Sequence, residues 1–311
     1  MNVTVSAQNN IIFGPINSRR FGMSLGVDLS PSSKQCNFDC LYCELAPMAT
    51  VDKQTEIISV EEIIDAIKPH LNSKIDVITL TANGEPTLYP YLSELIEAIN
   101  AIKGKTQTLI LTNSATLIDK RVYSALLKLD QVKLSLDAIS SDVFKKIDRP
   151  HKSIQVDEIV QKVIEFSQEY RGKLFIEILF VHTLNDTKEE ISKLNTTLLK
   201  VHANRVDLGT IDRPPAYPVM GISYKELHKI SLMFDNSIPI HIASRMHAEP
   251  NNAYYSEEEI INTLDKRPLT QEDIDLLFDE KSKEMLQNLL KQGKIKIKNI
   301  GNLDFFILDI K

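Results

Sequence analysis

The sequence of 311 residues has no tryptophan, only ten glycines and only three cysteines. Three cysteines are too few for a disulfide scaffold, and their odd number indicates intracellular thiol chemistry instead. No apolar run approaches the roughly 20 residues that a membrane-spanning helix needs. The start, Met1–Asn10, is polar and uncharged, unlike a secretory signal. We therefore expect a cytoplasmic protein without a membrane segment.

Positive charge is also in short supply, because the formal net charge is −6 and the sequence pI is about 5.7. The chain as a whole should not be attracted to nucleic acid or to an anionic membrane. Its 43% apolar and 25% charged residues are typical of a globular protein rather than a disordered one. The length allows one large α/β domain with a small appendix.

Short apolar runs alternate with amphipathic segments through most of the chain. The runs predict strands that are covered on both faces, at Met23–Leu29, Ile75–Leu80, Thr108–Thr112, Val132–Leu136, Leu174–Val181, Arg205–Gly209 and Ile238–Ile242. Two of the intervening helices begin with capping-box patterns, Ser59 with Glu62 and Ser223 with Glu226. This alternation predicts βαβ units in a parallel sheet or barrel, with ligands at the carboxyl ends of the strands.

The pattern changes after a connector at Met246–Tyr255. Three short helical segments follow, and then two alternating segments, Lys294–Asn299 and Leu303–Asp309, form a predicted hairpin. Three helices and a two-stranded wing indicate a winged-helix module. The sequence therefore predicts two domains, residues 1–245 and residues 256–311.

The predicted module carries a local excess of positive charge. Between residues 281 and 298 one acid, Glu284, stands against six lysines, at positions 281, 283, 291, 294, 296 and 298. They fall on the third helix and the wing, which a winged helix uses to contact nucleic acid. The alternative is a module for protein contacts or packing, with lysines that protect a sheet edge.

All three cysteines lie within eight positions, Cys36-x3-Cys40-x2-Cys43, directly after the first predicted strand. Such a short loop brings three thiolates to one metal centre at little entropic cost. A structural zinc site takes four ligands, usually in pairs, and the chain has no second cysteine pair. A [4Fe–4S] cluster also takes four cysteines, so three would leave one iron open to a small molecule. The spacing favours an iron–sulfur cluster over zinc or unreactive thiols.

The cysteine segment, Cys36-Asn37-Phe38-Asp39-Cys40-Leu41-Tyr42-Cys43, resembles the C-x3-C-x-(aromatic)-C signature of the radical S-adenosylmethionine (SAM) superfamily. Asn83-Gly84-Glu85-Pro86, after the second predicted strand, is similar to the family's Gly-Gly-Glu-Pro turn, with Asn in place of the first Gly. The resemblance implies a partial (β/α)6 TIM-like barrel with one [4Fe–4S] cluster, SAM, and a flavodoxin- or ferredoxin-like reductant protein as partner.

The resemblance also assigns residues to the two cofactors. It implies that Cys36, Cys40 and Cys43 bind the cluster. The positions that it implies for contacts with SAM are Tyr42, Gly84, Glu85, Asn113, Ser135, Asp137 and Asn185. For Tyr42, simple core packing is the competing interpretation.

Longer strings resemble one subgroup, the iron–sulfur oxidoreductases grouped loosely with wyosine-type tRNA-modifying synthases. These strings are Phe13-Gly14-Pro15, Ser18-Arg19-Arg20, Ser24-Leu25-Gly26-Val27-Asp28, Gly84-Glu85-Pro86-Thr87-Leu88-Tyr89-Pro90 and Asp212-Arg213-Pro214-Pro215. The wyosine-forming enzymes need further cysteines for an auxiliary cluster, and this chain has none left. The resemblance therefore indicates common ancestry more than a common reaction.

Charged residues near the expected catalytic end are candidates for contact with substrate. Glu177 and Asp207 interrupt apolar strands, and such residues are seldom buried without partners. Arg213 follows the sixth predicted strand, and Arg19 with Arg20 precedes the first, where each could bind an anionic group. Structural ion pairs, or a solvated arginine pair, are the alternatives.

Three hypotheses about function follow. The first is a radical SAM enzyme that acts on a macromolecule, RNA or protein, docked through the C-terminal module. The second is a radical SAM enzyme that acts on a small metabolite or activates a glycyl-radical partner. The third is a non-enzymatic iron–sulfur or zinc regulator that binds DNA.

Overall fold

The computed structural model describes residues 11–18, 20–71, 74–242, 254–266, 268–300 and 303–309. Arg19, most of the predicted connector and residues 301–302 of the predicted hairpin lie outside these ranges. In the part of the chain that is described, no helix is both long enough and apolar enough to cross a membrane.

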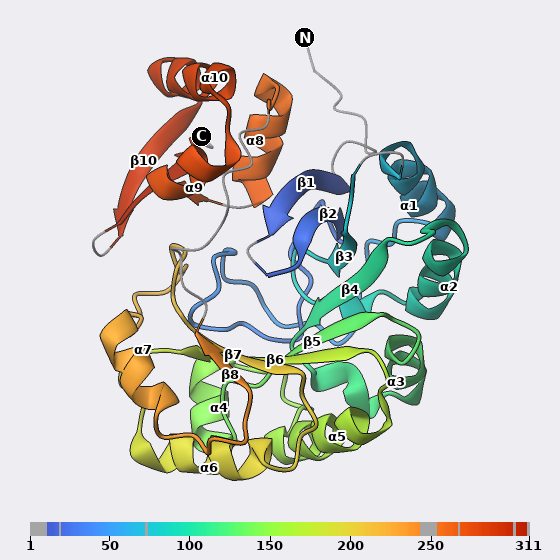
Figure 1. Ribbon diagram of the computed structural model, residues 1–311, viewed down its shortest axis with the longest axis vertical. Helices are drawn as coiled ribbons and strands as arrows, with labels where there is room; N and C mark the ends of the chain where they lie inside the picture. Colours follow the sequence, from blue (N-terminus) through green and yellow to red (C-terminus); the bar gives the residue numbers. More distant parts are fainter. Residues whose placement is uncertain are drawn as a thin grey trace.

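An eight-stranded sheet forms the centre of the larger part of the protein (Figure 1). Its strands are β1 Ile12–Ser18, β2 Gly22–Asp28, β3 Val77–Thr81, β4 Gln107–Thr112, β5 Gln131–Ser135, β6 Lys173–Phe180, β7 Arg205–Thr210 and β8 Ile240–Ile242. They are ordered in space as in the sequence, and β2 to β8 are parallel. The seven strands that the apolar runs predict are confirmed.

The first strand, β1, is the element that the sequence prediction missed. It pairs antiparallel with β2, so the sheet holds seven parallel strands and one antiparallel edge strand rather than six βα units alone. Proline within a run argues against a strand, and Pro15 lies between Phe13 and Ile16, where the register with β2 shifts. The irregularity accommodates the proline at the sheet edge.

Helices cover the outer face of the curved sheet, and the long loop after β2 crosses its inner side (Figure 1). The α-helices are α1 Val60–Ile67, α2 Leu92–Ile102, α3 Lys120–Leu126, α4 Ser141–Ile147, α5 Val156–Glu169, α6 Lys188–Leu198 and α7 Tyr224–Ser231. Single 3₁₀ turns lie at η2 Lys68–His70, η3 Pro86–Leu88 and η4 Ala115–Ile118. Both predicted capping boxes are confirmed, at the starts of α1 and α7.

Apolar side chains from the strands and from these helices form one continuous core. On α2, for example, Leu92, Leu95 and Ile99 lie three or four residues apart and are all buried. Residues three or four apart share one face of a helix, so this stripe turns towards the sheet. The strand ends are thereby fixed, which is what positions the loops that follow them.

The C-terminal elements pack next to β1 at the edge of the sheet (Figure 1). They are α8 Glu257–Lys266, β9 Leu269–Thr270, α9 Gln271–Leu277, α10 Glu280–Lys291, β10 Ile295–Ile300 and β11 Leu303–Leu308. The three strands form a second sheet in the order β10–β11–β9. A second apolar cluster, which includes Phe278, Leu286 and Phe306, fills this part and takes in Ile16 of β1.

Candidate functional site

The three cysteines lie in the loop between β2 and α1, which we call the cysteine loop (residues 29–59). Gln35 ties this loop to the turn after β3, because its N–H donates to the Asn83 carbonyl (2.7 Å) and its own carbonyl accepts from the Glu85 N–H (2.9 Å). On the other side, the N–H of Asp39 donates to the carbonyl of Asp148 (3.1 Å). The loop is therefore fixed at the carboxyl ends of the parallel strands, where ligands of such folds bind.

Gly84 makes the contact between the cysteine loop and β3 possible. It adopts φ +132°, and a Cβ at this position would lie 2.0 Å from the carbonyl oxygen of Gln35. A larger residue could not approach so closely without displacing the loop. The close approach that the structure shows at Gly84 is to the cysteine loop, and the predicted contact of this glycine with SAM stays a prediction.

The three thiols are half-buried and free of disulfides. The Phe38 N–H donates to the Cys36 sulfur (3.4 Å), and the Cys40 thiol lies 3.5 Å from a carboxyl oxygen of Asp148. Burial raises the pKa of Cys36 to about 12 and that of Cys40 well above its usual range. Without a ligand the thiols are neutral, so binding of a metal must release their protons.

The donor set of the loop fits an iron–sulfur cluster by its chemistry, because thiolate sulfur is the usual ligand of such clusters. Among the described residues, no group of three or more His, Cys, Asp or Glu side chains is arranged to hold a single metal ion. In a cluster each thiolate binds a different iron, so the three sulfurs need not converge on one point. Cys36, Cys40 and Cys43 thus match a polynuclear centre in type and number.

Glu85 is buried beside the cysteine loop, with 2% of its surface exposed. Its carboxylate accepts hydrogen bonds from the Asn113 N–H (2.8 Å), the Thr112 hydroxyl (2.6 Å) and the Thr87 N–H (3.1 Å). Burial raises the pKa of Glu85, while these donors oppose that rise. The carboxylate thus joins the turn after β3 to the end of β4, next to the thiols.

Asn113 faces the cysteine loop, and its predicted contact with SAM stays a prediction. Its side-chain amide donates to the Asn37 side chain (2.6 Å) and lies 3.9 Å from the Cys36 sulfur. Asn37 was not among the predicted site residues, although it follows the first cysteine directly. Its side chain links the end of β4 to that cysteine.

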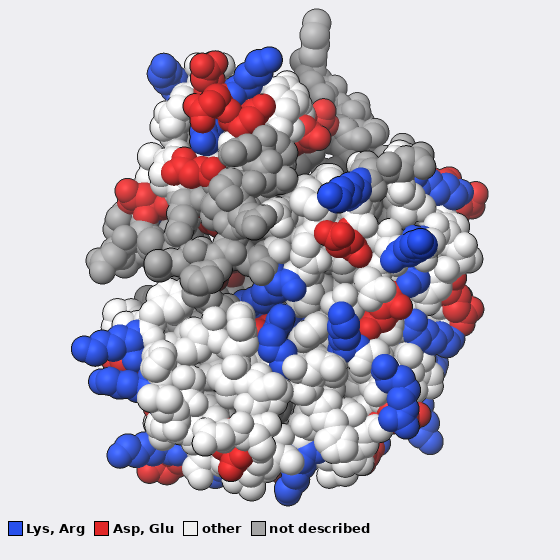
Figure 2. Space-filling model, in the orientation of Figure 1, with Lys and Arg blue, Asp and Glu red and all other residues white. Residues whose placement is uncertain are grey.

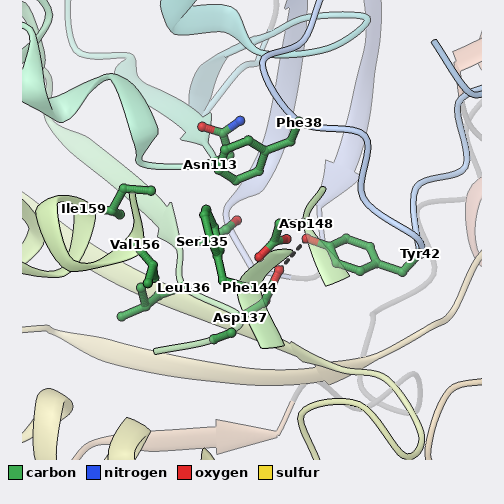
Figure 3. Close-up of a pocket in the computed structure, with 11 residues that line it drawn as sticks. Phe38, Tyr42, Asn113, Ser135, Leu136, Asp137, Phe144, Asp148, Val156 and Ile159 are labelled. Atoms are coloured by element: carbon green, nitrogen blue, oxygen red, sulfur yellow. Dashed lines mark hydrogen bonds between the residues drawn. The ribbon is translucent and has the colours of Figure 1, made fainter. Parts of the chain in front are cut away.

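Asp137 and Tyr42 meet at the end of β5, where the Tyr42 hydroxyl donates to the Asp137 carboxylate (Figure 3). The second Asp137 oxygen accepts from the Leu179 N–H (2.7 Å). Asp148 lies beside this pair in a small pocket that Phe38 also lines. Burial raises the pKa of Asp137 to about 7, and burial together with Asp137 raises that of Asp148 well above its usual range.

The other two predicted contacts of SAM differ in their surroundings. Ser135 is half-buried. It lines the same pocket as Asp137, which lies two residues after it in the sequence. Asn185 is fully buried, accepts from the Val181 N–H (2.8 Å) and donates to the carbonyls of Asp137 (2.9 Å) and Leu179 (2.8 Å). Asn185 therefore braces the ends of β5 and β6, and its predicted contact with adenine stays a prediction.

Three predicted charged residues come together on the inner face of the sheet. Arg20 lies 2.7 Å from Glu177 and 3.3 Å from Asp207, measured between nitrogen and oxygen. Arg20 belongs to the turn between β1 and β2, so it directly precedes the strand that the sequence predicts as the first, and it follows β1, which the sequence did not predict. The three residues form one ionic network, which is the structural alternative weighed for them.

Two further cations, Lys133 and Arg205, and the imidazole of His241 were missed by the sequence prediction. Lys133 is buried and pairs with Glu177, while Arg205 (2.7 Å) and His241 (3.1 Å) pair with Asp207. Register explains the grouping, because Glu177, Asp207 and His241 are direct neighbours on β6, β7 and β8. Glu177 was found because it is a charged residue that interrupts an apolar strand. Lys133 interrupts its strand in the same way, so the same criterion could have found it.

Arg213 joins the cysteine loop rather than this network. Its guanidinium pairs with Glu44, the residue after Cys43. Nearby, the Ala216 N–H donates to the Cys43 carbonyl (2.8 Å). The segment after β7 is therefore attached directly to the third cysteine.

The environment of Gly84 leads to a first prediction. Gly84→Ala should displace the cysteine loop, and the variant should incorporate little iron and sulfide during anaerobic reconstitution. Gly104→Ala is the matched control, because Gly104 also has positive φ (+59°) but open space around its Cβ position. Iron content per chain is the measurement, and circular dichroism checks the fold. Equal iron content in the two variants would contradict the role of the Gly84 contact.

Glu177 gives a prediction on stability and pH. Burial alone would raise the pKa of this carboxyl, but Lys133 and Arg20 lower it to about 2, below the ordinary value of 4.5. Glu177→Gln should lower the free energy of unfolding of the cluster-free protein by about 3 kcal/mol at pH 7, because the buried Lys133 loses its paired carboxylate and Arg20 keeps only Asp207. A depressed pKa stabilises the fold above pH 4.5, and this contribution is lost as the pH falls towards 2.

Urea denaturation at pH 7 and at pH 3 measures this difference. The gap between wild type and Glu177→Gln should be smaller at pH 3. The exposed Glu158→Gln serves as control and should change little at either pH. A gap that does not depend on pH would show that the charge of Glu177 does not stabilise the fold.

Comparison with known proteins identifies the family to which this chain is similar. Residues 30–194, slightly more than half of the chain, match the family model of the Radical SAM superfamily. A UPF0026 protein of Helicobacter pylori strain J99 is 40% identical over 300 residues, which cover 95% of this chain and 97% of that protein. A UPF0026 protein of Methanocaldococcus jannaschii is 30% identical and covers 97% of both chains.

Solved structures show a similar fold. A structure of TYW1 with a bound lysine–pyruvate adduct superposes with a TM-score of 0.52 and 19% sequence identity, over 69% of this chain and 74% of that one. Members of the matched superfamily are enzymes that bind a [4Fe–4S] cluster and SAM, and they generally need a reductant. From the family match, the relatives and the shared fold, this chain belongs to the radical SAM superfamily of enzymes.

Proposed function

We propose that Cys36, Cys40 and Cys43 hold one [4Fe–4S] cluster with an open iron, and that the enzyme uses it to cleave SAM reductively. The observation that carries this proposal is the attachment of the cysteine loop to the turn after β3 through Gln35. This attachment puts three thiols and the Glu85 carboxylate at one edge of the sheet. When bound, the two cofactors supply a 5′-deoxyadenosyl radical that abstracts a hydrogen atom from the substrate.

The residues near the thiols have donors and acceptors that suit SAM. Glu85 is fixed by three neighbouring donors, and its negative charge suits the ammonium of the methionine part. Ser135 at the end of β5 and Asp137 two residues after it line the same small pocket, a placement that suits a ribose diol. Asn113 lies between this group and Cys36, while Tyr42 offers its ring for the adenine. We assign Asn185 to the adenine side, where it braces the strand ends.

We place the substrate on the side of the ionic network of Arg20, Glu177 and Asp207. Asp207 is fully buried, whereas Arg20 and Glu177 keep 23% and 29% of their side-chain surface exposed. A substrate that reaches the inner face of the sheet would meet these two exposed charges. Arg213, beside Cys43, is the further candidate, while Arg19 of the original set lies outside the described residues.

We also propose that the chain has two domains, residues 1–245 and 256–311, and that the second is a winged helix. Two separate apolar clusters support the division, although Ile16 joins the second one. The order α8–β9–α9–α10–β10–β11 supports the winged helix, since three helices precede a two-stranded wing. Helix α8 contacts β1, and the Tyr255 hydroxyl donates to the Pro15 carbonyl (3.3 Å), so the module is packed on the barrel.

The substrate in this proposal is a macromolecule, RNA or protein, that the C-terminal module helps to dock. Half of its six lysines pair with acids, namely Lys283 with Glu280, Lys294 with Glu257 and Lys296 with Asp309. On the face shown in Figure 2, both signs of charge stand side by side over this module. Lys281, Lys291 and Lys298 are exposed and are the candidates for contact with the substrate.

The superfamily assignment excludes one of the three hypotheses drawn from the sequence. A non-enzymatic regulator is excluded, because the chain belongs to a superfamily of enzymes. An enzyme that acts on a small metabolite or a glycyl-radical partner remains the second candidate.

The cluster assignment leads to a direct prediction. Cys40→Ala should reduce the formation of 5′-deoxyadenosine and methionine to the background of cluster-free protein, because the cluster loses a ligand. Ser32→Ala, in the same loop but exposed, should keep the activity of the wild type. The reconstituted proteins are reduced with dithionite, and the products are measured by liquid chromatography. Undiminished product from Cys40→Ala would contradict the assignment.

The substrate class can be tested by isotope transfer. Cells grown in deuterated medium supply RNA, protein and small-metabolite fractions, and each is incubated with SAM and the reduced enzyme. We expect deuterium in 5′-deoxyadenosine from the RNA or the protein fraction, and less of it with a Lys281→Gln, Lys291→Gln, Lys298→Gln variant. Transfer from the small-metabolite fraction, unchanged in that variant, would favour the second candidate.

A further inference from the structure

An open groove of about 470 Å³ lies beside the cysteine loop. It is lined by Asp39, Pro47, Met48, Ala49, Thr50, Arg149 and Tyr217. We call it the outer groove. None of the residues assigned to SAM or to the ionic network lines it, so it is separate from the site described above.

Every wall of the outer groove is attached to the cysteine loop near a cysteine. Asp39 precedes Cys40 directly, and the strip 47–50 follows Cys43 and returns to Cys36, whose carbonyl accepts from the Val51 N–H (2.8 Å). A surface built in this way lies directly over the segment that would hold the cluster.

The other two walls come from distant parts of the sequence. Arg149 follows Asp148, whose carboxyl oxygen lies 3.5 Å from the Cys40 sulfur. Tyr217 follows Ala216, whose N–H donates to the Cys43 carbonyl (2.8 Å). The groove therefore offers short covalent and hydrogen-bonded routes to all three cysteines.

The groove itself is fixed by an ionic arrangement around Asp39. This carboxylate lies 3.5 Å from Lys34 and 3.3 Å from Arg149, and it accepts from the Tyr217 hydroxyl. The Arg149 guanidinium also stacks on the Tyr217 ring, 4.6 Å from its centre. The mostly buried side chain of Lys34 and the Arg149 of the wall together outnumber the one carboxylate between them, so the Asp39 charge is balanced and Arg149 adds positive charge at the groove.

Further positive charge continues along the neighbouring segment. Lys145 and Lys146 in the last turn of α4, Arg149 and Lys152 are all exposed, while the nearby Asp148 is buried. This segment is held to the cysteine loop by the Leu41 N–H, which donates to the Ile147 carbonyl (2.8 Å). We call these four residues the basic strip. It stands out in a chain whose net charge is −6.

We propose that the outer groove and the basic strip form the docking site of an acidic one-electron carrier protein. Exposed Pro47, Met48 and Ala49 supply an apolar centre, and the strip supplies a charged rim, as in transient protein interfaces. This inference rests on the proposed cluster, which needs an electron from outside. One electron passes from the reduced carrier, which is oxidised, to the oxidised cluster, which is reduced, and no atom is transferred.

An RNA substrate is the competing occupant of a basic surface. The position of the strip favours the carrier, because the strip is bonded to the backbone of the cysteine loop. A substrate must instead reach the radical, which arises on the side of SAM. The apolar centre of the groove also suits a protein partner better than a phosphate backbone.

The test uses a purified flavodoxin, an acidic flavoprotein, with the full-length reconstituted enzyme. The test variant carries Lys145→Glu, Lys146→Glu and Lys152→Glu. The matched control carries Lys105→Glu, Arg171→Glu and Lys173→Glu, which are exposed at the amino-terminal ends of β4 and β6, opposite the cysteine loop. Both variants change the net charge by the same amount.

Binding is measured by isothermal titration calorimetry at two salt concentrations, and electron transfer by the rate of SAM cleavage with reduced flavodoxin. We expect the test variant to lose about tenfold in affinity and the control to stay near the wild type. The affinity of the wild type should fall with salt. With dithionite in place of flavodoxin, all three proteins should cleave SAM equally.

The outcomes separate this inference from the proposed function. Equal loss of flavodoxin binding in both variants, or binding that is insensitive to salt, would overturn the docking site. So would a wild type that binds transfer RNA through the strip and does not bind flavodoxin. Failure to cleave SAM with dithionite would contradict the proposed function, whereas flavodoxin binding would still report on the docking site.

Discussion

The contact between Gln35 and Gly84 is the constraint on which the candidate site depends. Two backbone hydrogen bonds between Gln35 and the residues on either side of Gly84 hold the cysteine loop against the end of β3, and Gly84 leaves room for the loop because a Cβ there would lie 2.0 Å from the Gln35 carbonyl oxygen. From that point the same turn supplies Glu85, and Glu85 in turn fixes Asn113 at the end of β4. Thiols and carboxylate share one edge of the sheet because the backbone is fixed there, not because the side chains attract one another.

The carboxyl groups near the thiols and the carboxyl group of Glu177 differ in whether cations surround them. Near the thiols, Asp137 and Asp148 are buried and form no ion pair with any residue that the structure describes, and burial raises the pKa of both. Further along the strands, Glu177 has two cationic partners, and its pKa is lowered to about 2. Glu177 thus belongs to a stable ionic network, while the carboxyl groups near the thiols are ones that a bound cationic ligand would ionise.

Most of the barrel could be predicted from the sequence, because buried parallel strands and capped helices leave strong local patterns. The edge strand β1 could not, since Pro15 masks it and its pairing depends on β2. The cysteines and Glu85 were found from spacing and resemblance. Asp148 was missed because its contact with Cys40 forms only after folding, whereas Lys133 interrupts an apolar strand and could have been found by the criterion that identified Glu177.

The central claim is that this chain holds one [4Fe–4S] cluster with an iron that is free to bind SAM. Mössbauer spectroscopy of anaerobically reconstituted protein, recorded before and after addition of SAM, tests it most directly. The account predicts about four irons per chain in a cubane cluster and a change at a single iron site when SAM is added. A mononuclear iron or zinc centre, or a cluster whose spectrum SAM leaves unchanged, would contradict it.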